Sequence, residues 1–107
     1  MASGFNGQSF AFLGYLPIDA SDRQKQLKVM ENRIWNESQT QIFIETPYRN
    51  NKLVADLLHQ LRPATKLCIA CDISLDTEWI VTRSVAAWKK SEIPDLGKRP
   101  TIFLLYK

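Results

Sequence analysis

Short apolar segments that alternate with helical segments constrain the fold of this chain more than any other feature of its sequence. Valine, isoleucine, threonine and aromatic residues concentrate in these short segments, as is typical of β-strands. We expect strands at residues 8–16, 40–46, 66–72, 78–85 and 101–106. The last of them, TIFLLY, is almost continuously apolar, which predicts a central position in the sheet.

Residues 19–37 have the repeat of an amphipathic helix. Leu27, Met30 and Ile34 recur at three- and four-residue spacing and define one apolar face. Asp19 or Ser21 can cap the N-terminus of this helix.

A second helix is expected from Thr46-Pro47 to about residue 61, because a capping hydroxyl precedes a proline suited to the first helical position. Asn50 is an alternative cap, and residues 86–90 can form one further helical turn. The link between residues 72 and 78 is too short for a crossover helix, so at least one strand pair should be antiparallel. The sequence therefore predicts an α/β fold for residues 1–107 as a single domain. We expect a three-layer sandwich with a mixed sheet of about five strands and helices on both faces.

Composition narrows the class of protein. Hydrophobic residues make up 45% of the 107 residues, which is typical of a folded domain with a core. The net charge of +3, from 14 basic and 11 acidic residues, permits contact with nucleic acid but does not predict it. We expect no membrane span, because no segment reaches the roughly 18 apolar residues that one requires. The start of the chain lacks the pattern of a signal peptide, and with two cysteines we expect a cytoplasmic protein with reduced thiols.

Three common chemical signals are weak in this sequence. Cys68 and Cys71 have C-x-x-C spacing, but in a strand residues three apart point to opposite faces, so we interpret them as structural. His59 is the single histidine and is interpreted as a surface or helix-end residue. The four glycines form no phosphate-binding loop, so a nucleotide-like cofactor would need a glycine-rich segment from another domain.

The segment 42–49, IFIETPYR, is the most informative part of the chain. A strand runs directly into a helix start, and ligands of open α/β sheets bind beyond the carboxyl ends of strands. Glu45 and Thr46 would stand at that position, next to the N–H groups of the helix N-terminus. In the alternative interpretation, Glu45 and Arg49 form a local ion pair and Thr46 only caps the helix.

This segment resembles the strand-to-helix motif of the tetrapyrrole methylase superfamily. It is most similar to the I-F-Y-E-S-P-H-R-like sequence of the branch that methylates a cytidine ribose 2′-hydroxyl in small-subunit ribosomal RNA. Residues 2–5 (ASGF), residues 10–17 (FAFLGYLP) and Arg23 are similar to the family's S-G-L…F-x-F-x-G-F-L-P…R. The resemblance covers nearly the whole chain, in order and with similar spacing.

The resemblance implies a two-domain methyltransferase, usually a homodimer, that binds S-adenosylmethionine in the cleft between its domains. The N-terminal domain of the family carries the glycine-rich loop, and this chain corresponds to the second, C-terminal domain without it. We therefore expect three partners: the N-terminal domain of the same protein, a second copy of the protein and the small ribosomal subunit as substrate. The chain alone should be inactive.

The resemblance also implies candidate site residues by position. Those at the adenosine end of the cofactor would be Glu45, Thr46, Ala70, Cys71, Pro100 and Thr101. Those that could meet RNA phosphates would be Arg49, Lys98 and Arg99. No catalytic residue is assigned, and Glu45 is the one candidate base to test.

Two blocks of the sequence depart from the family pattern. The family's A-R-E-L-T-K-like block reads Ala70 to Leu75 here, ACDISL, without the arginine and the lysine, and its K-G-E-like block reads Lys98 to Pro100, KRP, without the acid. Two alternatives therefore stay open. The chain can belong to a methyltransferase for a tetrapyrrole or another small molecule, or it can be a non-catalytic binding or dimerisation module.

Overall fold

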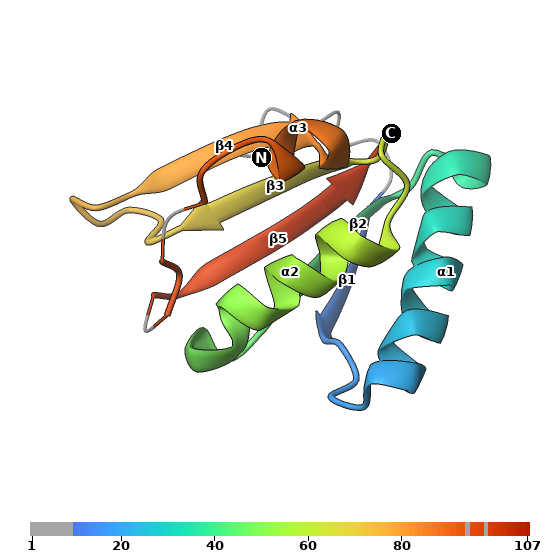
Figure 1. The fold of residues 1–107 in the computed structure, drawn as a ribbon, viewed down its shortest axis with the longest axis horizontal. Helices are drawn as coiled ribbons and strands as arrows, with labels where there is room; N and C mark the ends of the chain where they lie inside the picture. The colour runs from blue at the N-terminus through green and yellow to red at the C-terminus, as the bar shows by residue number, and fades with distance from the viewer. Residues whose placement is uncertain (1–9, 94, 98) are drawn as a thin grey trace.

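The structure, a computed structural model, describes residues 10–93, 95–97 and 99–107. Its elements follow the predicted alternation closely (Figure 1). They are β1 (Phe10–Tyr15), α1 (Ala20–Glu37), β2 (Thr40–Ile44), the 3-10 turn η1 (Pro47–Arg49), α2 (Asn50–Gln60), β3 (Lys66–Cys71), β4 (Trp79–Ser84), α3 (Val85–Lys89) and β5 (Thr101–Tyr106). None of the described helices combines the length and the apolar character needed to cross a membrane.

The five strands form one mixed sheet in the order β1-β2-β5-β3-β4. β1 and β2 are parallel, whereas β5 is antiparallel to both of its neighbours and β4 is antiparallel to β3. The predicted α/β class and mixed five-stranded sheet are confirmed. β5 lies in the middle of the sheet, as its apolar sequence predicted.

The predicted three-layer sandwich with helices on both faces is wrong for the described residues, because all three helices cover the same face. Buried side chains of α1, α2 and α3 belong to one core cluster, which also contains Phe43, Leu67 and Phe103 from the strands. The strand order gives the reason. The crossovers β1–α1–β2 and β2–α2–β3 step across the sheet in the same direction, and right-handed crossovers then place both helices on one side. The other face carries a smaller cluster around Ile42, Cys68 and Leu104.

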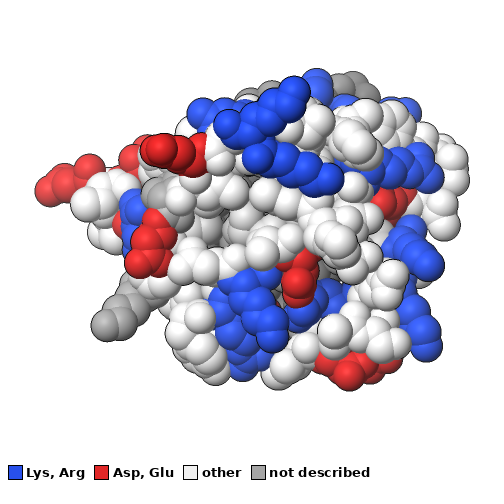
Figure 2. All heavy atoms as spheres, viewed as in Figure 1, with Lys and Arg blue, Asp and Glu red and all other residues white. Residues whose placement is uncertain are grey.

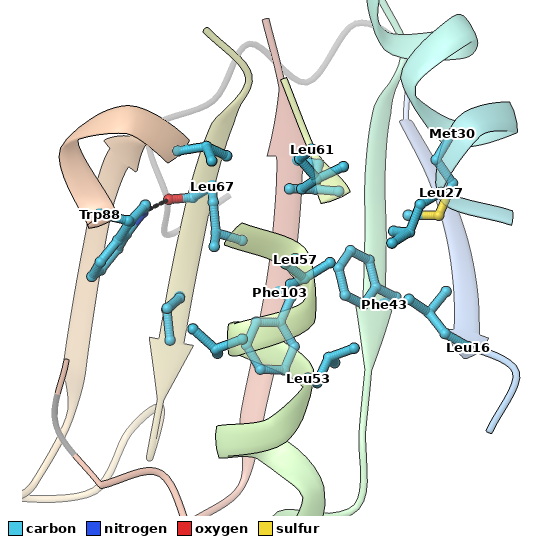
Figure 3. Close-up of a cluster of buried hydrophobic side chains, with 14 of the residues drawn as sticks. Leu16, Leu27, Met30, Phe43, Leu53, Leu57, Leu61, Leu67, Trp88 and Phe103 are labelled. Carbon is cyan, nitrogen blue, oxygen red and sulfur yellow. Dashed lines mark hydrogen bonds between the residues drawn. The ribbon is translucent and has the colours of Figure 1, made fainter. Parts of the chain in front are cut away.

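The main core lies between α2 and the centre of the sheet (Figure 3). Phe43 and Phe103 stack on neighbouring strands, with ring centroids 5.5 Å apart. Trp88 of α3 is fully buried, and its indole N–H donates a hydrogen bond of 2.8 Å to the carbonyl of Leu67 (Figure 3). This bond satisfies the one polar atom of a large apolar side chain and fixes α3 to β3.

The ends of the helices depend on local polar contacts. Asp19 caps α1 as predicted and accepts a hydrogen bond of 3.0 Å from the N–H of Asp22. The second helix differs from its prediction. Thr46 precedes a 3-10 turn and its side chain makes no capping bond, so the α-helix itself begins at Asn50. The two long helices are joined by an ion pair between Arg23 and Asp56.

Candidate functional site

A pocket of about 340 Å³ lies at one edge of the sheet. β1, β2 and β3 all end at this edge, because β2 and β3 both run antiparallel to β5, which begins there. Open α/β sheets bind their ligands at this edge, beyond the carboxyl ends of their strands. The pocket is lined by Tyr15, Ile44, Glu45, Pro47, Ala70, Ile73, Pro100, Thr101 and Ile102.

The floor of the pocket is a row of side chains that crosses four strands. Tyr15 pairs with Ile44, and Ile102 lies opposite Ile44 on one side and opposite Ala70 on the other. Side chains at paired positions share a face, and these point away from the core that the helices cover. The pocket therefore opens on the face of the sheet that carries none of the described helices.

Tyr15 reaches this row because β1 has a bulge. Phe12 pairs with Ile42 and Tyr15 with Ile44, so one extra residue of β1 is accommodated between the two pairs. Gly14 has φ +69°, a left-handed conformation that suits glycine. Without the extra residue Tyr15 would point to the helix-covered face. The bulge instead brings a tyrosine that is 63% exposed to the pocket.

Glu45 lines one side of the pocket, and Thr46 lies directly beside it. The Glu45 side chain is buried, and its Oε1 accepts a hydrogen bond of 2.8 Å from the backbone N–H of Thr46. Arg49 forms no salt bridge with Glu45, although both residues are described; its guanidinium donates to the Tyr48 hydroxyl at 2.9 Å. The alternative interpretation of a Glu45–Arg49 ion pair is therefore wrong. The hydrogen bond from Arg49, and then one from Thr46, lower the pKa of Tyr48 below its ordinary value.

A network around Asp72 lies next to two lining residues of the pocket, Ile73 and Pro100, without lining it. The Nε of Arg99 donates to Asp72 at 2.8 Å, and the Thr77 hydroxyl donates to the same carboxylate oxygen at 2.8 Å. These two bonds, with that of Arg99 the stronger influence, lower the pKa of Asp72 below its ordinary value. The N–H of Asp72 donates to the carbonyl of Pro100 at 2.9 Å, which ties the end of β3 to the start of β5.

Four of the six predicted cofactor residues meet in this pocket: Glu45, Ala70, Pro100 and Thr101. Thr46 lies beside it and contributes a hydrogen bond to Glu45 without lining it. Cys71 is not among the lining residues, because its side chain is packed in the main core on the other face.

The three predicted phosphate-binding residues are not collected at one place. Arg99 is engaged by Asp72 and by the carbonyl of Thr77, Arg49 contacts Tyr48, and Lys98 lies outside the described residues. On the helix-covered face, lysine and arginine side chains occur in several groups separated by acidic and uncharged residues (Figure 2). The described residues of that face therefore form no continuous basic stripe.

Most residues of the pocket floor were not among the site residues predicted from the sequence. Ile44 and Ile102 could have been found from strand alternation, since each neighbours a predicted residue, but their pairing across β2 and β5 is not visible in the sequence. Tyr15 depends on the bulge, which only the isolated Gly14 within a strand pattern signals.

The cysteines and metal-binding side chains offer no second site in the described part of the chain. Cys68 and Cys71 are free and buried on opposite faces of β3, as predicted from strand alternation. Burial raises the pKa of the Cys68 thiol, and a hydrogen bond with Thr82 partly offsets this. Among the described residues, no group of three or more histidine, cysteine, aspartate or glutamate side chains could hold a metal ion.

Comparison with known proteins agrees with this geometry. No family model matches the chain. A curated relative from Leptospira borgpetersenii serovar Hardjo-bovis (strain L550), "Ribosomal RNA small subunit methyltransferase I", is 32% identical over 80 residues. The match covers 72% of this chain and 30% of the relative. The resemblance to the tetrapyrrole methylase superfamily is confirmed.

The solved structure of one methyltransferase has a similar fold. The methyltransferase CobJ superposes with a TM-score of 0.58 at 12% identity, over 99% of this chain and 44% of that one. Uroporphyrin-III C-methyltransferase from Thermus thermophilus, complexed with S-adenosyl homocysteine, gives a TM-score of 0.48 at 16% identity, over 94% and 42% of the two chains. This chain thus spans about a third of its curated relative and less than half of these solved chains.

Proposed function

We propose that this chain is the C-terminal domain of a two-domain methyltransferase dependent on S-adenosylmethionine, and that its pocket is one wall of the cofactor site. One observation carries the proposal. Four residues that the family resemblance placed near the cofactor, at three separate positions in the sequence, line a single pocket at the carboxyl edge of the sheet. The other wall would come from an N-terminal domain that supplies the glycine-rich loop.

The chemistry of the pocket suits a nucleoside. Its floor is apolar apart from the tyrosine hydroxyl, and a flat purine can pack on Tyr15 and the two isoleucines. Glu45 adds one anchored carboxylate that can accept hydrogen bonds from hydroxyl or amino groups. In methyl transfer the main task of such a wall is to hold the donor in line with the acceptor oxygen. We assign Glu45 to cofactor binding and not to the role of general base. Its Oε1 already accepts a hydrogen bond from the backbone N–H of Thr46.

For the substrate we propose the 2′-hydroxyl of a cytidine in small-subunit ribosomal RNA. The curated relative, named as a small-subunit ribosomal RNA methyltransferase, supports this choice. The described pocket residues include no cation, so phosphate contacts would have to come from Arg49, from Lys98 and from other domains. We further propose that the protein acts in the cytoplasm as a homodimer, as the resemblance implies.

A methylation assay tests this function. The full-length protein that carries this chain is incubated with methyl-labelled cofactor and small ribosomal subunits that lack the modification, and we expect label in the RNA. Ala70→Phe, which fills the floor of the pocket, should reduce transfer at least about tenfold by displacing the cofactor. Ala86→Phe is the matched control, since Ala86 is exposed on α3 and does not line the pocket. Absence of label with cofactor binding intact would exclude the ribosomal substrate.

A further inference from the structure

A fully buried asparagine lies behind the pocket and connects its two sides. Asn50 is the first residue of α2 and has 0% exposure. Its Nδ2 lies 3.2 Å from the carbonyl oxygen of Leu96, 2.9 Å from that of Arg99 and 3.1 Å from the hydroxyl of Thr101. These partners are 46 to 51 residues away in the sequence, so the contacts join two distant parts of the chain.

The polarity of these contacts identifies what Asn50 contributes. Two of the three partners are carbonyl oxygens, which only accept, so the side chain acts there as a donor. Its Oδ1 is buried and meets no hydrogen-bond partner in the described part of the chain. A buried acceptor without a partner is unfavourable, and an apolar side chain would avoid that cost. The donor bonds therefore give the reason for an asparagine at this position.

The segment that Asn50 holds supplies one side of the pocket. Pro100 and Thr101 line the pocket, and the Thr101 hydroxyl both accepts from Asn50 and donates to the carbonyl of Arg99 at 3.0 Å. Pro47, on the other side of the pocket, lies three residues before Asn50 at the start of the same helical segment. Asn50 thus fixes the distance between the two sides without itself lining the pocket.

We propose that Asn50 is a positioning residue for the pocket, which holds Pro100 and Thr101 in the arrangement that binds the methyl donor. The proposal rests on the proposed function for its ligand. Asn50 acts through Thr101 and through the carbonyl of Arg99, and the neighbouring Asn51 extends the same attachment by accepting from the N–H of Leu96 at 2.8 Å. The helix start and the entry to β5 consequently move as one unit.

The structural part of the proposal is tested by amide hydrogen exchange on the 107-residue chain. The N–H of Asp72 donates to the carbonyl of Pro100, so its exchange rate reports whether the segment of Pro100 and Thr101 is held in place. Asn50→Leu keeps the branched shape and the number of side-chain heavy atoms but removes the donor, and we expect Asp72 to exchange about tenfold faster. Leu57→Val, a core change in the same helix, is the control and should not accelerate Asp72 more than the core amides of β3. An unchanged Asp72 rate in Asn50→Leu overturns the proposal.

The ligand part is tested by titration with S-adenosylhomocysteine, followed by the amide shifts of the pocket residues. Asn50→Leu should weaken binding about tenfold relative to the unsubstituted chain, whereas Leu57→Val should leave it within twofold. Equal affinity in Asn50→Leu and the unsubstituted chain overturns the positioning role. If the unsubstituted chain shows no shift at millimolar ligand, the proposed function fails instead, and the exchange rate of Asp72 still decides whether Asn50 holds the wall.

Discussion

Asp72 shows how a single residue holds the chain segments next to the pocket, because its N–H is bonded to the carbonyl of the lining residue Pro100. Asp72 has a positive φ of 53° and receives hydrogen bonds from Arg99 and Thr77. A non-glycine residue in this conformation costs about 1–2 kcal/mol, so the surrounding bonds must hold it there. They also anchor Arg99, so this arginine is engaged within the fold and is not a free cation for RNA.

The lowered pKa of Asp72 predicts a specific dependence of stability on pH. A carboxyl group whose pKa is lower in the folded state stabilises the fold above its unfolded pKa, about 3.9 for aspartate. That contribution is lost as the pH falls through the folded pKa. Asp72→Asn should therefore melt at a lower temperature than the unsubstituted chain at about pH 7.

The difference should disappear at strongly acidic pH, where both side chains are neutral. Thermal unfolding followed by circular dichroism between about pH 2 and pH 7 measures it. Asp76→Asn, an exposed change in the same loop, is the control and should follow the unsubstituted chain throughout. A melting difference for Asp72→Asn that stays constant over the whole range would contradict the role of the Arg99 contact.

Residue positions in the site were predictable only where they follow from strand ends. Glu45, Ala70 and Thr101 stand at or next to the ends of apolar segments, and such ends meet at one edge of a sheet. The partner of Arg99 was not predictable, because Asp72 lies 27 residues away and the contact depends on how two loops meet. The Cys71 side chain lies in the core and not in the pocket, since strand alternation turns every second side chain to the helix-covered face.

At the level of single elements, the end of α1 offers a stabilising substitution. Ser38 caps this helix with φ 54° and ψ 33°, a left-handed conformation that glycine adopts without steric cost. Ser38→Gly should raise the free energy of unfolding by about 0.5–1 kcal/mol, after the larger entropy of glycine in the unfolded chain is subtracted. Chemical denaturation measures the change. Gln39→Gly, one residue further, should not stabilise the chain, and a Ser38→Gly chain no more stable than the original would refute the prediction.

The type of each element was predictable from periodicity, whereas the side of the sheet that each helix covers was not. Leu27, Met30 and Ile34 identify the buried face of α1 from their spacing alone, and all three are buried. Which face of the sheet receives that helix depends on the strand order. The order in turn depends on β5, the last segment of the chain, which inserts between β2 and β3. The apolar sequence of β5 predicts a central strand, but no local pattern shows between which two strands it lies. Helices on both faces were therefore predicted, and one face was found.

At the scale of the whole molecule, the two-layer architecture and the pocket are connected. The helices bury one face of the sheet, while the pocket floor of Tyr15, Ile44, Ile102 and Ala70 belongs to the other. Phe10 and Phe12 of β1 pair with residues of that same face and are more than half exposed. Apolar surface of this kind usually marks a contact with another protein surface. A second domain that supplies the remaining wall of the site would approach from this side.

This arrangement predicts that the chain alone binds the methyl donor poorly. Ligand sites of high affinity enclose most of the ligand surface, whereas this pocket supplies one wall. We expect a Kd in the millimolar range for S-adenosylmethionine and the 107-residue chain, which corresponds to about −4 kcal/mol. The full-length protein should bind in the micromolar range, because enclosure by the other domain adds roughly another 4 kcal/mol.

Titration by nuclear magnetic resonance measures the weak affinity of the chain, and calorimetry measures that of the full-length protein. Ala70→Phe should abolish the amide shifts at the carboxyl edge of the sheet, while Ala86→Phe should preserve them. Of these two alanines, Ala70 lines the pocket and Ala86 does not. Micromolar binding by the chain alone would mean that this one wall suffices for tight binding. The proposal that the chain supplies half of the cofactor site would then be wrong. Millimolar binding that survives Ala70→Phe would place the ligand elsewhere on the molecule. Binding that is weak, confined to this edge and strengthened in the longer protein is the combination that only a shared site between two domains produces.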